Sequence, residues 1–166
     1  MIPKVLKGFN LFVDGRGYAG RVEELTLPKL SLKTEEIKAG GMDAPIEIEM
    51  GMEKLECDMT ISEYDPEIIK MFGLNNGAQV PLTLRGGLDG EEGVIPVVLT
   101  LRGAWRELDF GNWKSGENAP LKVSVALRYY RLEINGAELV EIDPENMVRK
   151  IDGNDQLEAL RGAIGI

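Results

Sequence analysis

The sequence predicts a mostly β protein with a β-sandwich or barrel-like core, a short helix in the middle and a short C-terminal helix. Apolar and polar residues alternate in short stretches along most of the chain, at the spacing typical of sandwiches and barrels. The 20 glycines and 8 prolines among 166 residues indicate many tight turns. No internal repeat or low-complexity segment interrupts this pattern, so we expect one domain over residues 1–166.

The N-terminal segment predicts a β-hairpin followed by an interrupted strand. Asp14 and Gly15, with Gly17 close behind, separate two short apolar runs in "NLFVDGRGYAGRV", and an Asp-Gly pair between such runs is a strong hairpin signal. The next stretch, from Leu25 to Lys33, alternates on both sides of Pro28. Because proline cannot donate a hydrogen bond to a sheet ladder, we expect this strand to bend or end there.

Residues 45–61 predict a second hairpin with one apolar and one mainly acidic face. Isoleucine and glutamate alternate in "IEIEM", and a second alternating stretch, "KLECDMTI", follows the predicted turn "GMEK". Cys57, the only cysteine, falls on the apolar face of this pattern. We therefore expect its thiol to be buried.

Two short helices are predicted from capping signals. Asp65 supplies an N-cap, and Pro66 and Glu67 are typical first-turn residues, so we expect a helix over 66–72. Near the C-terminus, Asn154 is a candidate N-cap, and Leu157 lies one helical turn before a second leucine. We expect a short terminal helix there.

The remaining strands predict a third and a fourth hairpin. "VPLTLRGG" and "GVIPVVLTLRGAW" flank the turn "LDGEE", and the run "VIPVVLTL" is apolar enough to lie in the middle of the core. Asn135 and Gly136 form the best two-residue turn in the chain. Before that turn, the apolar phase changes near Tyr129 and Tyr130. A change of phase predicts a bulge or a strand that passes between two sheets.

Bulk composition excludes several classes of function. The net charge of −9 and the pI of about 4.7 argue against a protein that grips phosphate backbones. The chain has no histidine, which removes the commonest general base and zinc ligand. No apolar run reaches membrane-spanning length, and the N-terminus lacks the core of a secretory signal. We expect no enzyme activity, no cofactor, no metal site, and retention in the cytosol of the producing cell.

Carboxylates and aromatic residues are the remaining candidates for chemistry. The predicted hairpin over 45–61 places acids on one face, which is typical either of a solvated sheet face or, less commonly, of a carboxylate-dependent hydrolase. Its spacing does not match a calcium-binding loop. Four aromatic residues are candidates for ligand stacking, although large aromatics on strands usually belong to a core or an interface: Trp105, Trp113, Tyr129 and Tyr130.

Several segments, in order, resemble a known family. They are "NLFVDG", "LTLPKLSLKTEEIKAGGMDAPIEIEMG", "PVVLTLRG", "GNWKSGE", "YYRLEINGAELVEID" and "NDQLEALRGAIG". Together they resemble the major tail tube proteins of contractile-tailed phages and the related tube proteins of R-type bacteriocins. The resemblance runs along almost the whole chain and is weakest over about 62–92.

The resemblance implies a structural function. Subunits of this family close into homo-hexameric rings that form a large composite β-barrel, and the rings stack into a hollow tube inside a contractile sheath. The implied partners are other copies of the chain and the tail sheath, tape measure, baseplate and tail terminator proteins. DNA would pass without specific binding, or ions would pass in a bacteriocin, and a membrane would be met only at the target. The implied location is a virion or a released bacteriocin particle, assembled in the cytoplasm of the host bacterium.

The resemblance also assigns roles to two groups of residues. We expect the hairpin over 45–61 to line the lumen through Glu47, Glu49, Glu56 and Asp58, with an outer solvated face as the alternative. We expect the loop before it to contact neighbouring subunits or rings, with an ordinary surface loop as the alternative; its candidate residues are Gly40, Gly41, Met42 and Asp43.

A small monomeric β-barrel protein for an apolar or cationic ligand is the alternative to a tube subunit. Such a protein would remain a single 18.3 kDa species with a sealed pocket. The sequence leaves open whether the source is a phage, a defective prophage or a bacteriocin cluster.

Overall fold

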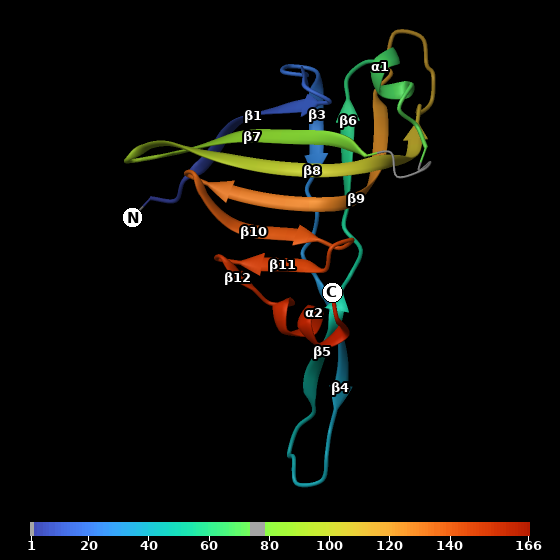
Figure 1. Cartoon of the computed structure of the whole chain (residues 1–166). Helices are drawn as coiled ribbons and strands as arrows, with labels where there is room; N and C mark the ends of the chain where they lie inside the picture. Colours follow the sequence, from blue (N-terminus) through green and yellow to red (C-terminus); the bar gives the residue numbers. More distant parts are fainter. Residues whose placement is uncertain (1, 74–78) are drawn as a thin grey trace.

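A computed structural model describes residues 2–73 and 79–166 and confirms a mostly β fold with two short helices (Figure 1). The strands are β1 (Val5–Val13), β2 (Arg16–Gly17), β3 (Val22–Thr26), β4 (Leu32–Ile37), β5 (Ile46–Met52), β6 (Glu56–Ile61), β7 (Val80–Gly90), β8 (Gly93–Asp109), β9 (Leu121–Ile134), β10 (Ala137–Asp143), β11 (Val148–Ile151) and β12 (Asn154–Asp155). The helices are α1 (Pro66–Ile69) and α2 (Glu158–Ile164).

The strands form two packed layers that share the long strands β8 and β9. One layer runs in the antiparallel order β12-β11-β10-β9-β8-β7-β1-β2. The first half of β9 also pairs with β6, which pairs with β3. Figure 1 shows β3 and β6 running across the direction of β1, β7 and β10. The fold is therefore a sandwich whose layers cross at a steep angle and are joined by bent strands.

The core lies between these layers and is closed at one end by α1. Trp105 is fully buried, and its indole Nε1–H donates to the carbonyl oxygen of Ile68 at 2.8 Å. Cys57 is buried as predicted, and burial raises the pKa of its thiol to about 12. The other large side chains with almost no exposure come from both layers and from α1: Leu11, Val13, Met59, Ile61, Ile68, Leu82, Leu101, Leu121, Val123 and Val125.

The predicted change of phase in β9 corresponds to a bulge. The register between β8 and β9 shifts after the pair Arg102 and Tyr129, because Gly103 faces Leu127 and leaves Arg128 as the extra residue. Before the bulge, the second neighbour of β9 is β6, and after the bulge it is β10. Both forms of the prediction are confirmed, since the bulge lies where the strand passes from one layer to the other.

Gly103 is required at this corner because the two backbones approach closely. A Cβ atom at this position would lie 2.3 Å from the carbonyl oxygen of Ala126 and 3.1 Å from Leu127 Cα. Backbone atoms held in a ladder cannot rotate away, so a Gly103→Ala variant is expected to lose about 3 kcal/mol of unfolding free energy. Chemical denaturation measures this loss. Gly8→Ala is the matched strand control, because nothing lies within 4 Å of its Cβ position; equal stabilities of the two variants would contradict the prediction.

Three of the four predicted hairpins are confirmed. Asp14–Gly15 joins β1 to β2, and Asn135–Gly136 joins β9 to β10, with positive φ at all four residues. The long hairpin of β7 and β8 closes at the pair Gly90 and Gly93. Pro28 lies between the end of β3 and the start of β4, which confirms a boundary there.

The predicted hairpin over 45–61 is wrong. β5 pairs with β4, whereas β6 lies between β3 and β9 in the other sheet. The predicted turn is partly strand, because β5 continues to Met52, and the chain then enters the sandwich as β6. We call β4, β5 and the loop 38–45 that joins them the arm. Figure 1 shows the arm extending away from the two layers.

Three other details differ from the sequence prediction. The run "VIPVVLTL" is only half buried: Leu101 is in the core, but Val94 is 69% exposed because the opposite layer does not reach it. α1 is shorter than the predicted helix over 66–72, although the Asp65 carboxylate accepts from the Glu67 amide as expected. Asn154 lies in β12 and does not cap α2, since the chain makes one more short strand before the helix begins.

Candidate functional site

The predicted site residues lie on two separate surfaces of the structure. Among the described residues, no group of three or more His, Cys, Asp and Glu side chains is placed to hold a metal ion. Neither of the two described helices could span a bilayer. The two surfaces that carry the predicted site residues are the outer side of the β3-β6-β9-β8 layer and the arm.

The outer side of the β3-β6-β9-β8 layer is acidic. Glu56 and Asp58 point away from the core because Cys57 and Met59, which alternate with them, are buried. Asp58 pairs with Ser124 of β9, which faces Glu107 of β8 in the next ladder. The surface defined in this way, the acidic face, carries five carboxylates and two cations: Glu24, Glu56, Asp58, Glu107 and Asp109, with Arg106 and Lys122.

The charges of the acidic face are only partly compensated. Arg106 donates to Glu56 Oε2 and to Ser124 Oγ, both at 2.8 Å. This guanidinium, followed by the nearby Lys54 ammonium, lowers the pKa of the Glu56 carboxyl. Asp58 and Glu107 have no ion pair among the described residues. The face therefore remains negative at neutral pH.

The arm is amphipathic, and it carries the other two predicted lumen residues. In the ladder between β4 and β5, Glu36 faces Glu47 and Thr34 faces Glu49, while Ile37 faces Ile46. Glu36, Glu47 and Glu49 therefore lie on one side of the arm, and the isoleucines lie on the other side together with Glu35, which faces Ile48. The four predicted acids do not share one surface: Glu56 and Asp58 belong to the acidic face, and Glu47 and Glu49 belong to the arm.

Glu49 connects the arm to the sandwich. Its carboxylate forms an ion pair with the Arg149 guanidinium of β11, whose residue is 7% exposed. A buried cation that keeps a single carboxylate partner depends strongly on that partner. The pair therefore stabilises the junction between the base of the arm and the sheet, a role that the sequence pattern did not indicate.

A Glu49→Ala variant is expected to lose about 2 kcal/mol of unfolding free energy, because the Arg149 guanidinium would stay buried without a counter-charge. Glu47→Ala is the matched control on the same strand face. Glu47 makes no ion pair within the described residues, so its removal should change stability by less than about 0.5 kcal/mol. Chemical denaturation of both variants measures the difference, and equal losses would contradict the role of the ion pair.

The four predicted contact residues form the tip of the arm. The Met42 amide donates to the Ala39 carbonyl at 3.1 Å, and Gly41 has a φ of 89°. Gly40, Gly41 and Asp43 are exposed and Met42 is partly exposed. The tip is thus a tight turn at the far end of the arm and does not pack on the body of the same chain.

The aromatic residues do not form a stacking surface. Trp105, Tyr129 and Tyr130 are buried, whereas Trp113 is 81% exposed. The Trp113 indole N–H donates to the Tyr64 hydroxyl at 2.8 Å. The set is divided between the core and one loop.

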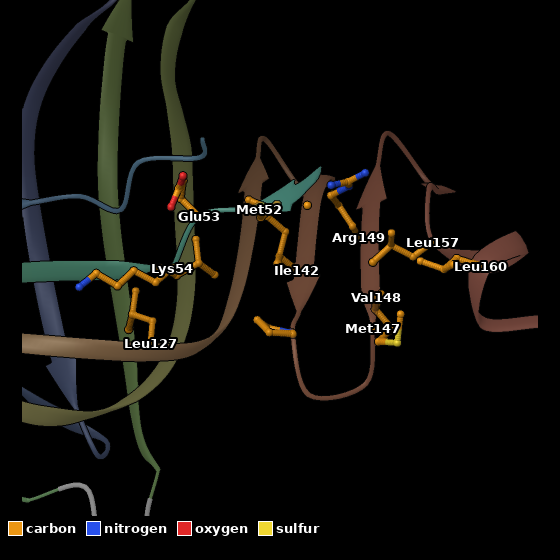
Figure 2. A pocket seen from close by; sticks show the side chains of 13 residues that line it. Met52, Glu53, Lys54, Leu127, Ile142, Met147, Val148, Arg149, Leu157 and Leu160 are labelled. Atoms are coloured by element: carbon orange, nitrogen blue, oxygen red, sulfur yellow. The ribbon is translucent and has the colours of Figure 1, made fainter. Parts of the chain in front are cut away.

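Figure 2 shows an apolar groove beside the base of the arm. Residues of β5, the β5–β6 connection, β10, β11 and α2 with its N-cap residue line about 420 Å³, among them Met52, Ile142 and Leu157. Both cations at its edge already have partners, since Arg149 pairs with Glu49 and Lys54 pairs with Glu56. The groove is half open, unlike the sealed pocket expected of a small β-barrel binder.

Comparisons with known proteins agree on one family. Residues 3–165 match the family model described as phage tail tube protein FII. The chain is 33% identical over 170 residues to the tail tube protein of Escherichia phage P2, covering 99% of both chains. It is 30% identical over 156 residues to the major tail tube protein of Serratia phage KSP20, covering 93% of this chain and 91% of the relative.

Solved structures of contractile injection systems share the fold. The sheath/tube terminator of the extracellular contractile injection system PVC matches with a TM-score of 0.62 at 11% identity, covering 80% of this chain and 98% of that chain. A chain of the PVC sheath-tube complex matches with a TM-score of 0.58 at 10% identity, covering 75% and 87%. A chain of the six-fold symmetrised baseplate of the anti-feeding prophage matches with a TM-score of 0.54 at 14% identity, covering 80% and 97%.

Proposed function

Because the chain belongs to the family of phage tail tube proteins, we propose that its copies close into hexameric rings and that the rings stack into a hollow conduit. Its role is structural, as a tube subunit of a virion or of a related injection particle. The six-fold symmetrised baseplate among the similar structures supports the hexamer.

One observation carries this proposal: among the described residues, the layer behind the acidic face has strand edges without a partner strand on both sides. β3 pairs only with β6 among the described strands. At the other side, β8 leaves β7 after Gly103, Phe72 bridges to Trp105, and the segment 106–109 pairs with β9 and with no other described strand. Exposed edges are templates for pairing with another chain. If the β3 edge of one copy joins the β8 edge of the next, the layers form a composite barrel wide enough for an aqueous lumen.

In such a barrel the acidic face lines the conduit. Its carboxylates repel the phosphate backbone, and the counterion release that drives DNA binding is absent. DNA would therefore pass without specific binding in a phage, and ions would pass in a bacteriocin. In this arrangement Glu56 and Asp58 keep the lumen role predicted from the sequence, and Glu24, Glu107 and Asp109 share it.

The arm would then provide contacts between subunits or between rings. Its tip, with Gly40, Gly41, Met42 and Asp43, lies far from the edges that close the barrel and is free to reach another copy (Figure 1). The outer side of the tube would meet a tail sheath protein, the lumen a tape measure protein, and the tube ends a baseplate and a tail terminator. Similar structures come from sheath-tube, terminator and baseplate assemblies, which supports the sheath, terminator and baseplate as partners.

Electron microscopy and sedimentation of the purified chain test the proposal. Rings or tubes should form as the protein concentration rises, with six-fold symmetry in end-on views. A single 18.3 kDa species at high concentration would overturn it and favour the monomeric ligand-binding alternative.

A further inference from the structure

The apolar side of the arm has no partner within its own chain. Ile37, Ile46 and Ile48 are 42%, 52% and 39% exposed, and Met50 continues the stripe at 53%. β4 and β5 pair only with each other, and the arm extends away from both layers (Figure 1). A two-stranded hairpin is at best marginally stable in water, and an exposed apolar stripe rimmed by charges marks an interaction surface. We call these four residues the arm stripe.

A second apolar surface of the same chain is open where the two layers do not overlap. β3 is the outermost described strand of its layer, and the inner side of β1, β7 and β8 next to its free edge is left uncovered. The resulting space, the rim groove, has a volume of about 490 Å³. Leu84 and Leu99 are buried beneath it, while its walls are half exposed: Leu6 53%, Phe9 42% and Leu27 50%.

We propose that the arm stripe of one copy docks in the rim groove of a neighbouring copy. This inference rests on the self-assembly proposed above and names the contact that the arm makes. Stripe and groove are different surfaces of one chain, so the contact is head-to-tail and each copy both gives and receives an arm. Such contacts propagate or close into rings, as a tube requires.

Charge complementarity favours the rim groove over the groove of Figure 2. The stripe side of the arm carries Lys33 and Glu35, and the rim groove carries Arg85, Glu23 and Glu24. None of these five has an ion pair among the described residues, so each charge of the arm has an available partner of opposite sign. In the groove of Figure 2, by contrast, Arg149 and Lys54 are already paired, so Glu53 is available to Lys33 but no lining cation is available to Glu35.

Disulfide cross-linking of assembled tubes tests the contact directly. Tubes of an Ile48→Cys/Leu27→Cys variant should give a ladder of linked multimers on a non-reducing gel after oxidation. Cys57 adds no background, since its thiol is buried and burial raises its pKa to about 12. Glu47→Cys/Leu27→Cys is the matched control, because Glu47 lies on the opposite side of the arm. Tubes without the ladder, or an equal ladder from the control, would overturn the docking. Failure of the unmodified chain to form tubes would instead overturn the proposed function.

Assembly of charged variants provides an independent readout. Ile46→Asp places a carboxylate in the apolar contact and should raise the concentration needed for assembly at least about tenfold. Thr34→Asp, on the other side of the arm, should leave that concentration near the wild-type value. Glu35→Arg and Arg85→Glu should each weaken assembly, and the combined variant should recover it. A combined variant weaker than either single variant, or equal effects of Ile46→Asp and Thr34→Asp, would contradict the docking.

Discussion

A Gly41→Val variant is expected to fold as a monomer and to fail in polymerisation. Gly41 holds a φ of 89° in the turn closed by the Met42 amide and the Ala39 carbonyl. Valine is strongly disfavoured at such an angle, so the tip of the arm must change shape. Because the tip does not pack on the sandwich, the unfolding free energy should stay within about 0.5 kcal/mol of wild type.

The effect on assembly is expected to be much larger than the effect on folding. Every copy in a tube would use its own tip, so a misplaced tip weakens every contact of that kind. The concentration needed for assembly should rise at least about tenfold, as measured by pelleting and electron microscopy, while circular dichroism shows an unchanged melting curve.

Gly40→Val is the matched control for this experiment. Gly40 is the neighbouring residue, but its φ lies outside the positive region and nothing lies within 4 Å of its Cβ position. If only backbone conformation matters, this variant should assemble almost normally. Loss of assembly in both variants would indicate that the tip surface itself forms the contact. Normal tubes from Gly41→Val would remove the tip from the assembly contacts.

The sequence predicted the parts of the fold that depend on neighbouring residues. Asp14–Gly15 and Asn135–Gly136 determine their hairpins because the turn conformation belongs to the two residues themselves. The bulge near Tyr129 was visible because a change of phase is a local pattern. These elements could be predicted without knowledge of the rest of the chain.

The prediction of a hairpin over 45–61 was wrong because strand pairing does not depend on neighbouring residues alone. Alternation shows which residues share a face, but it does not show which strand lies alongside. Glu56 and Asp58 therefore kept the orientation predicted for them, while β5 and β6 separated into different sheets. The ion pair of Glu49 with Arg149 joins residues 100 positions apart along the chain, and no local pattern indicates it.

The acidic face shows the same limit for the candidate site. Glu107 and Asp109 alternate with the partly buried Leu108, so their outward orientation could be predicted from the sequence. Their position beside Asp58 could not, since β9 lies between β8 and β6 and the register of both ladders sets it. The sequence therefore predicted an acidic surface, but of its carboxylates it predicted only Glu56 and Asp58.

Reversing charges on the acidic face is expected to convert a tube that does not bind DNA into one that does. An Asp58→Lys/Glu107→Lys/Asp109→Lys variant leaves two carboxylates, Glu24 and Glu56, beside five cations on this face. Lysines in a narrow lumen would neutralise phosphates and release counterions, so binding should weaken steeply as salt rises. Tubes assembled with short duplex DNA and then pelleted should retain DNA at low salt, whereas wild-type tubes should retain almost none.

A matched variant separates the lumen from a general effect of net charge. Glu91→Lys/Glu92→Lys/Glu138→Lys changes the net charge by the same amount at exposed residues that lie outside the acidic face. If the acidic face lines the conduit, DNA held there should also be protected from nuclease by the tube wall, and DNA attracted by the control should be digested. Equal binding and equal digestion for the two variants would place the acidic face on the outside of the tube, because only a surface open to solvent gives the nuclease the same access as the control sites.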